Sequence, residues 1–211
     1  MIYKNILSQK QIELLSKLQG ILPDCYMAGG TALALQLGHR TSLDFDFYTR
    51  DHFEIEKILA NFQKSFKKVK VERVVKDTLI LEVEDVSLSI FYYPYNLIKP
   101  LVHYSGVNLA SIEDIAAMKM VAISMRGKRR DFVDGYYLLK TFTLDEIIKL
   151  TLKKYPSYQS MVILKGLIYF KDAEKDDISR KIKIFDDNFS WDTVKNKILD
   201  EVEKYQENIL K

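Results

Sequence analysis

The amino-acid sequence predicts an α+β protein in which a small mixed sheet, flanked by helices, is followed by a helical C-terminal region. Helical and strand-like segments alternate through the first part of the chain. Several short strand-like segments then cluster together, and every periodic segment after them has helical spacing. We place the boundary near residue 108, so that residues 1–108 form a core domain and residues 109–211 form the helical region.

The first part combines both kinds of element. Helices are predicted at residues 8–22, 31–37 and 53–66, and strands at 25–28, 42–48, 69–75, 78–84 and 86–93, with a weaker strand-like stretch at 101–107. Glu84 and Asp85 separate the last two clear strands and predict a tight hairpin turn between them.

The second part is predicted to be helical throughout. Ser111 and Asp114 resemble the two ends of a capping box, and they open a helix that extends to about residue 125. Further helices are predicted at residues 131–140, 144–154, 158–170 and 191–210. The highly charged stretch 171–187 indicates either a linker or a mobile loop.

Composition sets outer limits on function. The chain has 211 residues, 47% hydrophobic and 29% charged, which is typical of a soluble globular protein. No apolar run approaches the roughly 20 residues needed to cross a bilayer, and the N-terminus has no signal-peptide pattern. We therefore expect a cytoplasmic protein without a membrane partner. Cys25 is the single cysteine, which excludes an internal disulfide and is expected to be an inert core thiol. The net charge of +3 neither requires nor excludes a nucleic-acid partner.

Asp44 and Asp46 are the first candidates for a functional site. Residues at i and i+2 of a strand project from the same face, so both carboxylates converge there. Two carboxylates held that close repel each other unless a cation lies between them. Such a pair suits Mg²⁺, or Mn²⁺, when substrate phosphates supply the remaining ligands. On its own, an Asp-x-Asp pair is more commonly a solvent-facing acidic pair.

Gly29, Gly30 and Thr31 lie between a predicted strand and a predicted helix. Two glycines there let the backbone approach a ligand closely, and the N-terminus of a helix favours anions. Thr31 either caps that helix or donates its hydroxyl to a phosphate. Together with the acidic strand, these residues predict a phosphate-binding turn one helix away from a metal-binding strand, as nucleotidyl transfer requires.

A second group of charged residues lies between residues 119 and 134. Lys119 and Arg126 are two helical turns apart and therefore share one face of a predicted helix. The residues Arg129, Arg130, Asp131 and Asp134 open the next helix, with both aspartates on one side. From these residues alone, the segment is a solvated corner with Arg–Asp pairs.

The string from Ala28 to Arg40, followed by Asp44 and Asp46, resembles the signature of polymerase-β-like nucleotidyltransferases. It is closer still to the AbiEii/AbiGii-type toxin nucleotidyltransferases of prokaryotic toxin–antitoxin and phage-defence systems. The resemblance covers roughly residues 26–140. It implies a polymerase-β-like core and transfer of a nucleoside monophosphate from an NTP to an RNA acceptor, such as a tRNA, or to a protein. It also implies a cognate antitoxin protein as partner.

The resemblance assigns roles to the second charged group. Lys119 would bind the triphosphate, and Arg126 or Arg130 would offer a planar donor fork to phosphate or acceptor. Asp131 is the third catalytic candidate, beside Asp44 and Asp46 as metal ligands. It either orients one of the cations or assists proton removal from the acceptor. Asp134 would support the site from behind, and the second part would complete the active-site cleft.

Three features leave alternatives open. Arg40 contacts phosphate or acceptor, or is an arginine of a surface loop. The aromatic cluster from Phe91 to Tyr95 stacks a nucleobase, or packs a strand end on the core. The strand 86–93 offers no acid on either face, although polymerase-β-like enzymes usually have a third carboxylate on a neighbouring strand, and Glu82 and Glu84 lie one strand further away. We therefore expect a one-metal site, with a nucleotide-binding regulatory or interaction protein that lacks turnover as the rival interpretation.

Overall fold

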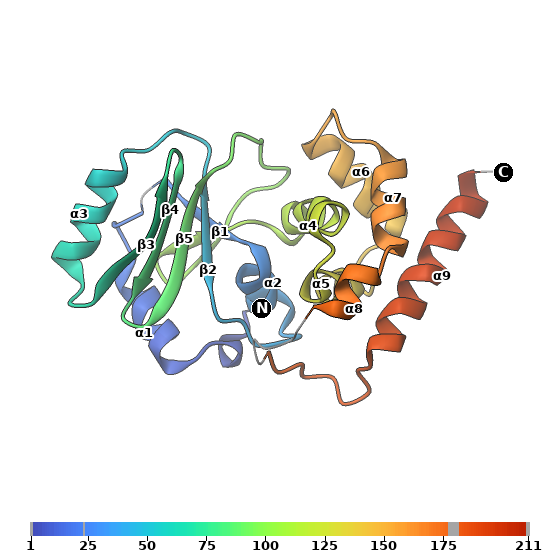
Figure 1. Ribbon diagram of the computed structural model, residues 1–211, viewed down its shortest axis with the longest axis horizontal. Coiled ribbons are helices and arrows are strands. Elements are labelled where there is room, and N and C mark those ends of the chain that lie inside the picture. Colours follow the sequence, from blue (N-terminus) through green and yellow to red (C-terminus); the bar gives the residue numbers. More distant parts are fainter. Residues whose placement is uncertain (1, 23, 177–181, 210–211) are drawn as a thin grey trace. The chain divides into compact units, whose positions relative to one another are not determined.

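The chain divides into two compact units, Met1–Ser111 and Ile112–Lys211. The computed structural model describes residues 2–22, 24–176 and 182–209. Unit 1 contains the sheet, and unit 2 is built of helices in the residues described (Figure 1). The α+β class predicted from the sequence is confirmed.

Unit 1 combines three α-helices and a short 3-10 helix with the strands of the sheet, counted over its described residues. The helices are η1 (Lys4–Ile6), α1 (Gln9–Lys17), α2 (Gly29–Leu37) and α3 (Ile55–Ser65). The strands are β1 (Tyr26–Ala28), β2 (Phe45–Thr49), β3 (Val69–Val75), β4 (Thr78–Val83), β5 (Val86–Tyr92), β6 (Val102–Tyr104) and β7 (Val107–Leu109).

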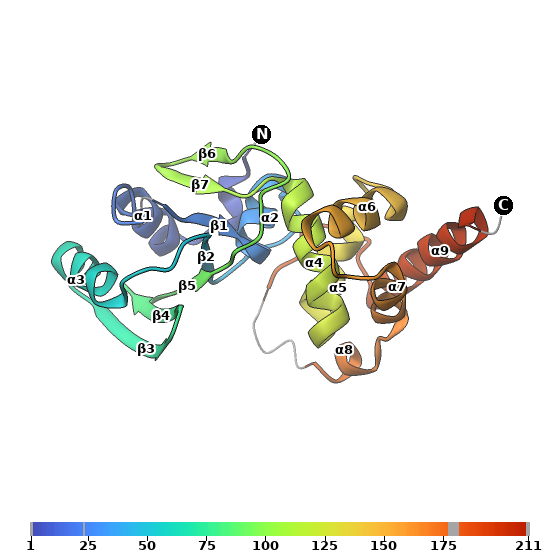
Figure 2. The ribbon, with the colours of Figure 1, turned by 90° about the horizontal axis from the view of Figure 1, so that it is seen from above.

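In the described part of the chain, seven strands form one mixed sheet in the order β3-β4-β5-β2-β1-β7-β6. The central strand β2 is parallel to β5 and antiparallel to β1, and β1 is parallel to β7. Figure 2 shows α1 and α3 on one face of this sheet and α2 on the other. Within unit 1, different helices therefore cover the two faces of the sheet.

The alternation of β2 separates a core face from a polar face. Phe45 and Phe47 are 0% and 1% exposed, and they form the core together with residues such as Leu88 and Ile90 of β5. Burying each of these side chains contributes about 1.5–3 kcal/mol. Asp46 and Tyr48 alternate with the two phenylalanines and are half-buried on the opposite face. The apolar core thus fixes the direction in which Asp46 points.

Two turns carry backbone conformations that short hairpins require. Glu84 and Asp85 have φ of 49° and 66°, which confirms the hairpin predicted between β4 and β5. The weak stretch 101–107 is also part of a hairpin, in which β6 and β7 pair across Ser105 and Gly106. Because β6 and β7 have only three residues each, the alternation of polar and apolar residues is too short to predict two strands.

The first helix is shorter than the apolar spacing indicated. Ser8 caps α1 through a capping box with Gln11, but the helix ends at Lys17. Leu18, Ile21 and Leu22, which continue the helical spacing, are nevertheless buried in the following turn. Burial without helix is the reason that the periodicity extended the helix too far.

Unit 2 packs around its first helix. Its elements are α4 (Ile112–Arg126), α5 (Arg129–Leu138), α6 (Leu144–Lys154), α7 (Ser160–Ile168), α8 (Lys171–Lys175) and α9 (Trp191–Ile209). The helix α4 packs against α5, α6 and α7. Between α4 and α6, Asp114 of the predicted capping box forms an ion pair with Lys154 at 2.7 Å, and both side chains are fully buried.

The charged stretch 171–187 begins with the short helix α8 rather than with a loop. Residues 177–181 of that predicted linker lie outside the described residues. Over the described chain, no helix has the length and apolarity needed to span a membrane.

Candidate active site

Asp46 lies beside the turn that opens α2. In the antiparallel pair of β1 and β2, Ala28 is opposite Asp46, and Gly29 follows Ala28 directly. Gly29 has φ +72°, and a Cβ placed on it would lie 3.0 Å from Asp46 Oδ2. A glycine is required at this position both by the backbone and by the approaching carboxylate. The Asp46 carboxylate therefore lies against the first residue of α2, where the helix dipole favours negative charge.

Gly30 makes room for a different side chain. A Cβ on Gly30 would lie 2.3 Å from Arg40 Nη2, so the arginine occupies the space that a larger residue would need. Arg40 is 2% exposed, and its Nη1 donates to the Thr41 carbonyl at 2.9 Å. The alternative of a surface-loop arginine is therefore wrong. Because glycine has no side chain, Asp46 can lie against Gly29 and Arg40 against Gly30.

Thr31 holds the start of the acidic strand in place. The helix α2 begins at Gly29 with Ala28 as its N-cap residue, so the prediction that Thr31 caps it is wrong. The buried Thr31 hydroxyl donates to the backbone carbonyl of Asp44 and lies 2.7 Å from Ser42 Oγ. Asp44 directly precedes β2 instead of lying within it. The hydroxyl thus fixes the backbone that carries the first carboxylate.

The neighbouring strand brings a serine, not an acid, next to Asp46. In the parallel pair of β2 and β5, Ser89 is opposite Asp46. Glu82 pairs with Ser87 and so shares this face, but it lies on β4, two strand spacings or about 10 Å from β2. The Glu84 carboxylate accepts hydrogen bonds from the backbone amides of Lys67 and Lys68, at 2.9 and 3.3 Å. Glu84 is therefore committed to the hairpin.

The donor set can be compared with the needs of a divalent cation. Among the described residues, no group of three or more His, Cys, Asp or Glu side chains could enclose a metal ion. Asp44 and Asp46, two residues apart in one segment, contribute hard carboxylate oxygens. Mg²⁺ is commonly bound through one or two carboxylates, with water and substrate phosphates completing its shell. The residues present fit a cation of that kind.

The second predicted cluster forms within unit 2. Lys119 of α4 lies 2.8 Å from Asp131 Oδ1 and 2.6 Å from Asp134 Oδ2, both on α5. The lysine side chain is 6% exposed, and both aspartates are fully buried. The i,i+3 spacing of the aspartates on α5 turns them toward one ammonium group. The local charge of this lysine is thus balanced inside the unit.

Arg126 completes the cluster. Its Nε and Nη2 donate to Asp131 at 2.7 and 2.9 Å, a bidentate pairing that guanidinium geometry favours. Burial alone would raise the pKa of Asp131, but the charges and hydrogen bonds of Lys119 and Arg126 outweigh it and lower that pKa to about 2. Asp131 is therefore ionised at neutral pH and is a weak base.

The two adjacent arginines of α5 differ in their surroundings. The Nε of Arg129 donates to the Ala173 carbonyl at 3.0 Å, and its guanidinium lies 4.8 Å from the centre of the Trp191 ring. Arg129 thus links α5 to α8 and α9. Arg130, the predicted substrate ligand, is half-exposed on the first turn of α5.

The chain matches the family model described as nucleotidyl transferase AbiEii toxin, type IV TA system, over residues 13–84 and 63–189. This chain belongs to the AbiEii nucleotidyltransferase toxin family. It is accordingly a transferase. The two matched segments together span Gly29, Asp46, Lys119 and Asp134, so every predicted site residue lies within the AbiEii region.

Individual relatives agree with this assignment. The uncharacterized protein aq_aa25 of Aquifex aeolicus is 37% identical to the chain, over 96% of the chain and 98% of that protein. The crystal structure of JHP933 from Helicobacter pylori is similar with a TM-score of 0.60 at 16% identity, covering 100% of this chain and 98% of that one. MenT4, a nucleotidyltransferase toxin from Mycobacterium tuberculosis, is similar with a TM-score of 0.59 at 14% identity, covering 93% and 86%. The last two similarities show a shared fold.

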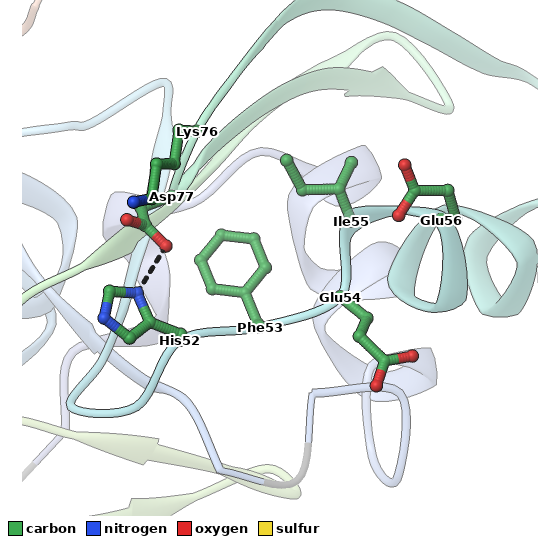
Figure 3. Close-up of a pocket in the computed structure, with 7 residues that line it drawn as sticks. All are labelled: His52, Phe53, Glu54, Ile55, Glu56, Lys76 and Asp77. Carbon is green, nitrogen blue, oxygen red and sulfur yellow. Dashed lines mark hydrogen bonds and ion pairs between the residues drawn. The ribbon is translucent and has the colours of Figure 1, made fainter.

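A hollow in unit 1 has none of the predicted site residues in its lining. It has a volume of about 350 Å³ and is lined by His52, Phe53, Glu54, Ile55, Glu56, Lys76 and Asp77 (Figure 3). In it, His52 Nδ1 lies 2.7 Å from Asp77 Oδ1, and the His52 ring stacks on Tyr92 with centroids 4.1 Å apart. His52 to Glu56 follow β2 and include the start of α3, and Lys76 and Asp77 lie between β3 and β4.

Sequence reasoning missed two serines, one that contacts Thr31 and one beside Asp46. Ser42 accepts a hydrogen bond on its carbonyl from Gln11 Nε2 at 2.9 Å and approaches the Thr31 hydroxyl. Ser89 lies beside Asp46 through strand pairing. Small hydroxyl residues carry little signal in a single sequence. The glycines and aspartates of the signature predict the turn, whereas Ser42 and Ser89 belong to neither motif.

Proposed function

We propose that the chain transfers a nucleoside monophosphate from an NTP to an RNA acceptor, tRNA included, or to a protein, and that Asp44 and Asp46 bind Mg²⁺ or Mn²⁺ for this reaction. The observation that carries the proposal is the position of the Asp46 carboxylate, against the glycine that opens α2. A negative charge and a helix N-terminus adjoin there, as recognition of a metal-bound triphosphate requires.

The reaction joins the acceptor hydroxyl oxygen to the α-phosphorus of the NTP. The bond between the α-phosphorus and the bridging oxygen breaks, pyrophosphate leaves, and the hydroxyl proton is released. A bound divalent cation would neutralise negative charge on the phosphate oxygens during this exchange. The protein's contribution is mainly positioning and charge complementarity.

The unit 1 residues divide this task. Asp44 and Asp46 would hold the cation, and Thr31 would act through Asp44, because its hydroxyl binds the Asp44 carbonyl. Gly29 and Gly30 would give the phosphates access to the helix N-terminus. Arg40, whose guanidinium adjoins Gly30, would contribute positive charge at the same turn.

The unit 2 residues would serve phosphate and acceptor. Lys119 and Arg126 are the cations of its cluster, and Arg130 adds a half-exposed guanidinium on the same helix as the aspartates. A carboxylate with a pKa of about 2 is poorly matched to accepting a proton near neutral pH. We therefore assign Asp131 to orienting Lys119 and Arg126, with Asp134 supporting the lysine.

The biological setting follows from the family. AbiEii proteins are described as toxins of toxin–antitoxin systems. We propose that this chain acts in the cytoplasm as such a toxin and that a cognate antitoxin protein opposes it.

Transfer can be measured directly. The protein is incubated with each α-labelled NTP, Mg²⁺ and total cellular RNA, and the label is followed in RNA and in protein. Asp46→Asn is expected to lower the rate by about 10³-fold or more, because a metal ligand becomes neutral. Asp51→Asn, an exposed aspartate a few residues along, is the matched control and should retain the rate.

The same assay addresses the rival interpretation. Ser89 beside Asp46 is the observation that favours a nucleotide-binding protein without turnover, since an acid is absent from that position. Nucleotide binding by the wild-type chain with no label transferred to any RNA or protein would support the regulator. Transfer that Asp46→Asn abolishes would exclude it.

A further inference from the structure

An aromatic surface lies on the same face of the sheet as Asp46. Tyr48 is two residues after Asp46 on β2, so its side chain leaves the same face about 6.6 Å further along the strand. Phe91 of β5 pairs with Tyr48, as Ser89 pairs with Asp46. The row of residues next to the carboxylate is therefore aromatic on two adjacent strands.

The rings form one continuous group, which we call the Tyr48 platform: Tyr26, Tyr48, Phe91, Tyr93 and Tyr95. The Tyr48 ring centre is 5.5 Å from Phe91 and 5.2 Å from Tyr93, and Tyr93 is 4.9 Å from Tyr95. Tyr26 on β1 stacks on Tyr48 at 6.1 Å. Such spacings are typical of attractive aromatic pairs and hold the rings in fixed orientations.

Exposure distinguishes this platform from core packing. The core side of β2 is already filled by Phe45 and Phe47, which are 0% and 1% exposed. Tyr48, Phe91 and Tyr93 are half-buried, and Tyr95 is 40% exposed. The platform thus extends from a buried ring at Tyr26 to an exposed one at Tyr95. Strand pairing puts Phe91 and Tyr48 on the face opposite Phe45 and Phe47, so these two rings lie outside the core layer that the phenylalanines fill.

A nucleobase is the chemical partner that this arrangement fits. Bases stack on aromatic side chains with little dependence on sequence, because every base has a π-face. A base is joined to its phosphate through one sugar, so a nucleotide held by phosphate near Asp46 carries its base a short distance away. Tyr48 of the platform is two residues from Asp46 on the same strand.

We propose that Tyr48, with Phe91 and Tyr93, forms a base-stacking subsite for a nucleotide of the reaction. The base belongs either to the NTP or to the terminal nucleotide of an RNA acceptor. This subsite rests on the proposed nucleotidyl transfer, and it assigns Tyr48 a role in substrate positioning beyond the metal and phosphate ligands. Its hydroxyl is not required for stacking.

Steady-state kinetics separate the two sources of the base. Tyr48→Leu is expected to raise the KM for one substrate roughly tenfold, because an apolar side chain of similar burial remains but the ring is lost. A rise in the KM for the NTP assigns the base to the nucleotide donor; a rise in the KM for RNA assigns it to the acceptor. Tyr48→Phe restores the ring and should recover most of the affinity. Tyr169→Leu removes a 50% exposed tyrosine of unit 2 and is the control.

A binding measurement is independent of turnover. The chain has one tryptophan, Trp191, so a Tyr48→Trp variant in a Trp191→Phe background reports on the platform alone. Titration with the four NTPs, the four nucleosides and short RNA should quench this fluorescence, whereas ribose 5-triphosphate, which lacks a base, should not. Quenching without any catalysed transfer would sink the proposed function and keep the subsite.

Two results would overturn the subsite. One is unquenched indole fluorescence of the Tyr48→Trp variant with every base-containing probe, when the circular dichroism of that variant matches wild type. The other is unchanged KM values in both Tyr48→Leu and Phe91→Leu. If Tyr48→Leu fails to fold, Phe91→Leu provides the same kinetic comparison from the neighbouring strand.

Discussion

The acidic pairs of the two units have similar sequence spacings and opposite surroundings. Asp44 and Asp46 of unit 1 are half-buried at the start of a strand. Asp131 and Asp134 of unit 2 are fully buried on a helix, and both bind the ammonium of Lys119. The first pair retains contact with solvent, while the second is enclosed and balanced by protein cations.

The two acidic pairs therefore differ in burial: the strand pair is half-exposed, and the helical pair is enclosed. Breaking a buried ion pair leaves an uncompensated charge and costs several kcal/mol, so Asp131 and Asp134 contribute to the integrity of unit 2. A half-exposed carboxylate can exchange solvent for an incoming cation at a lower desolvation cost. The comparison therefore assigns stability chiefly to the helical pair and ligand binding chiefly to the strand pair.

The largest expected effect is on stability. Asp131→Asn neutralises the carboxylate that pairs with Arg126 and one of the two that pair with Lys119. It should lower the free energy of unfolding by about 3–5 kcal/mol. Asp46→Asn should change it by less than about 1 kcal/mol. Urea unfolding is followed by Trp191 fluorescence for unit 2, because Trp191 packs against Phe132 of α5, and by circular dichroism for both units. Equal destabilisation by the two variants would contradict the larger contribution to stability that we assign to Asp131.

A smaller effect should appear with pH. The pKa of Asp131 is about 2 in the folded protein, against an ordinary value of 3.8. A folded-state pKa below the unfolded one stabilises above the unfolded value, so this contribution is complete above about pH 5. It is lost as pH falls through 4 toward 2, and it amounts to about 2 kcal/mol. Unfolding measured from pH 6 to pH 2 should show this loss in the wild type and not in Asp131→Asn, whose stability curve would otherwise run parallel.

The smallest expected effect tests the glycine turn. Gly30 is not among the residues with positive φ, so alanine there is opposed by Arg40 and not by the backbone. Gly30→Ala should cost about 1 kcal/mol, because the buried guanidinium must move. In an Arg40→Ala background this extra cost should disappear. A double-mutant cycle by thermal unfolding measures the coupling, and additive effects would show that Arg40 does not occupy the space beside Gly30.

Local patterns predicted much of the fold. The bounds of β3 and α6 agree with the predicted segments 69–75 and 144–154. The segment 69–75 is rich in valine, and 144–154 has helical spacing of its apolar residues. The alternation of Phe45 and Phe47 with Asp46 and Tyr48, visible in the sequence, matches the burial of β2. These features depend on neighbours within a few residues, and one sequence is enough to show them.

Features that depend on distant partners could not be predicted. Ser89 lies beside Asp46 because β2 and β5 are parallel neighbours, a pairing that periodicity does not specify. Arg129 and Arg130 are adjacent and chemically alike, but only Arg129 meets Trp191, which lies far along the chain. The helical spacing of Lys119 and Arg126 placed both on one face, yet the number of carboxylates around Lys119 required the packing of α4 on α5.

The hydrogen bond from Thr31 to the carbonyl of Asp44 has a consequence for the comparison of relatives. It connects the glycine turn to the acidic segment, because the Thr31 hydroxyl on α2 binds the backbone of Asp44 just before β2. Serine can replace threonine at position 31, whereas valine, of nearly the same size, would remove the hydroxyl that donates to this carbonyl. We expect homologues that lack Asp44 and Asp46 to lack a hydroxyl at position 31 as well. The identity of residue 31 would then distinguish active from inactive members of the family.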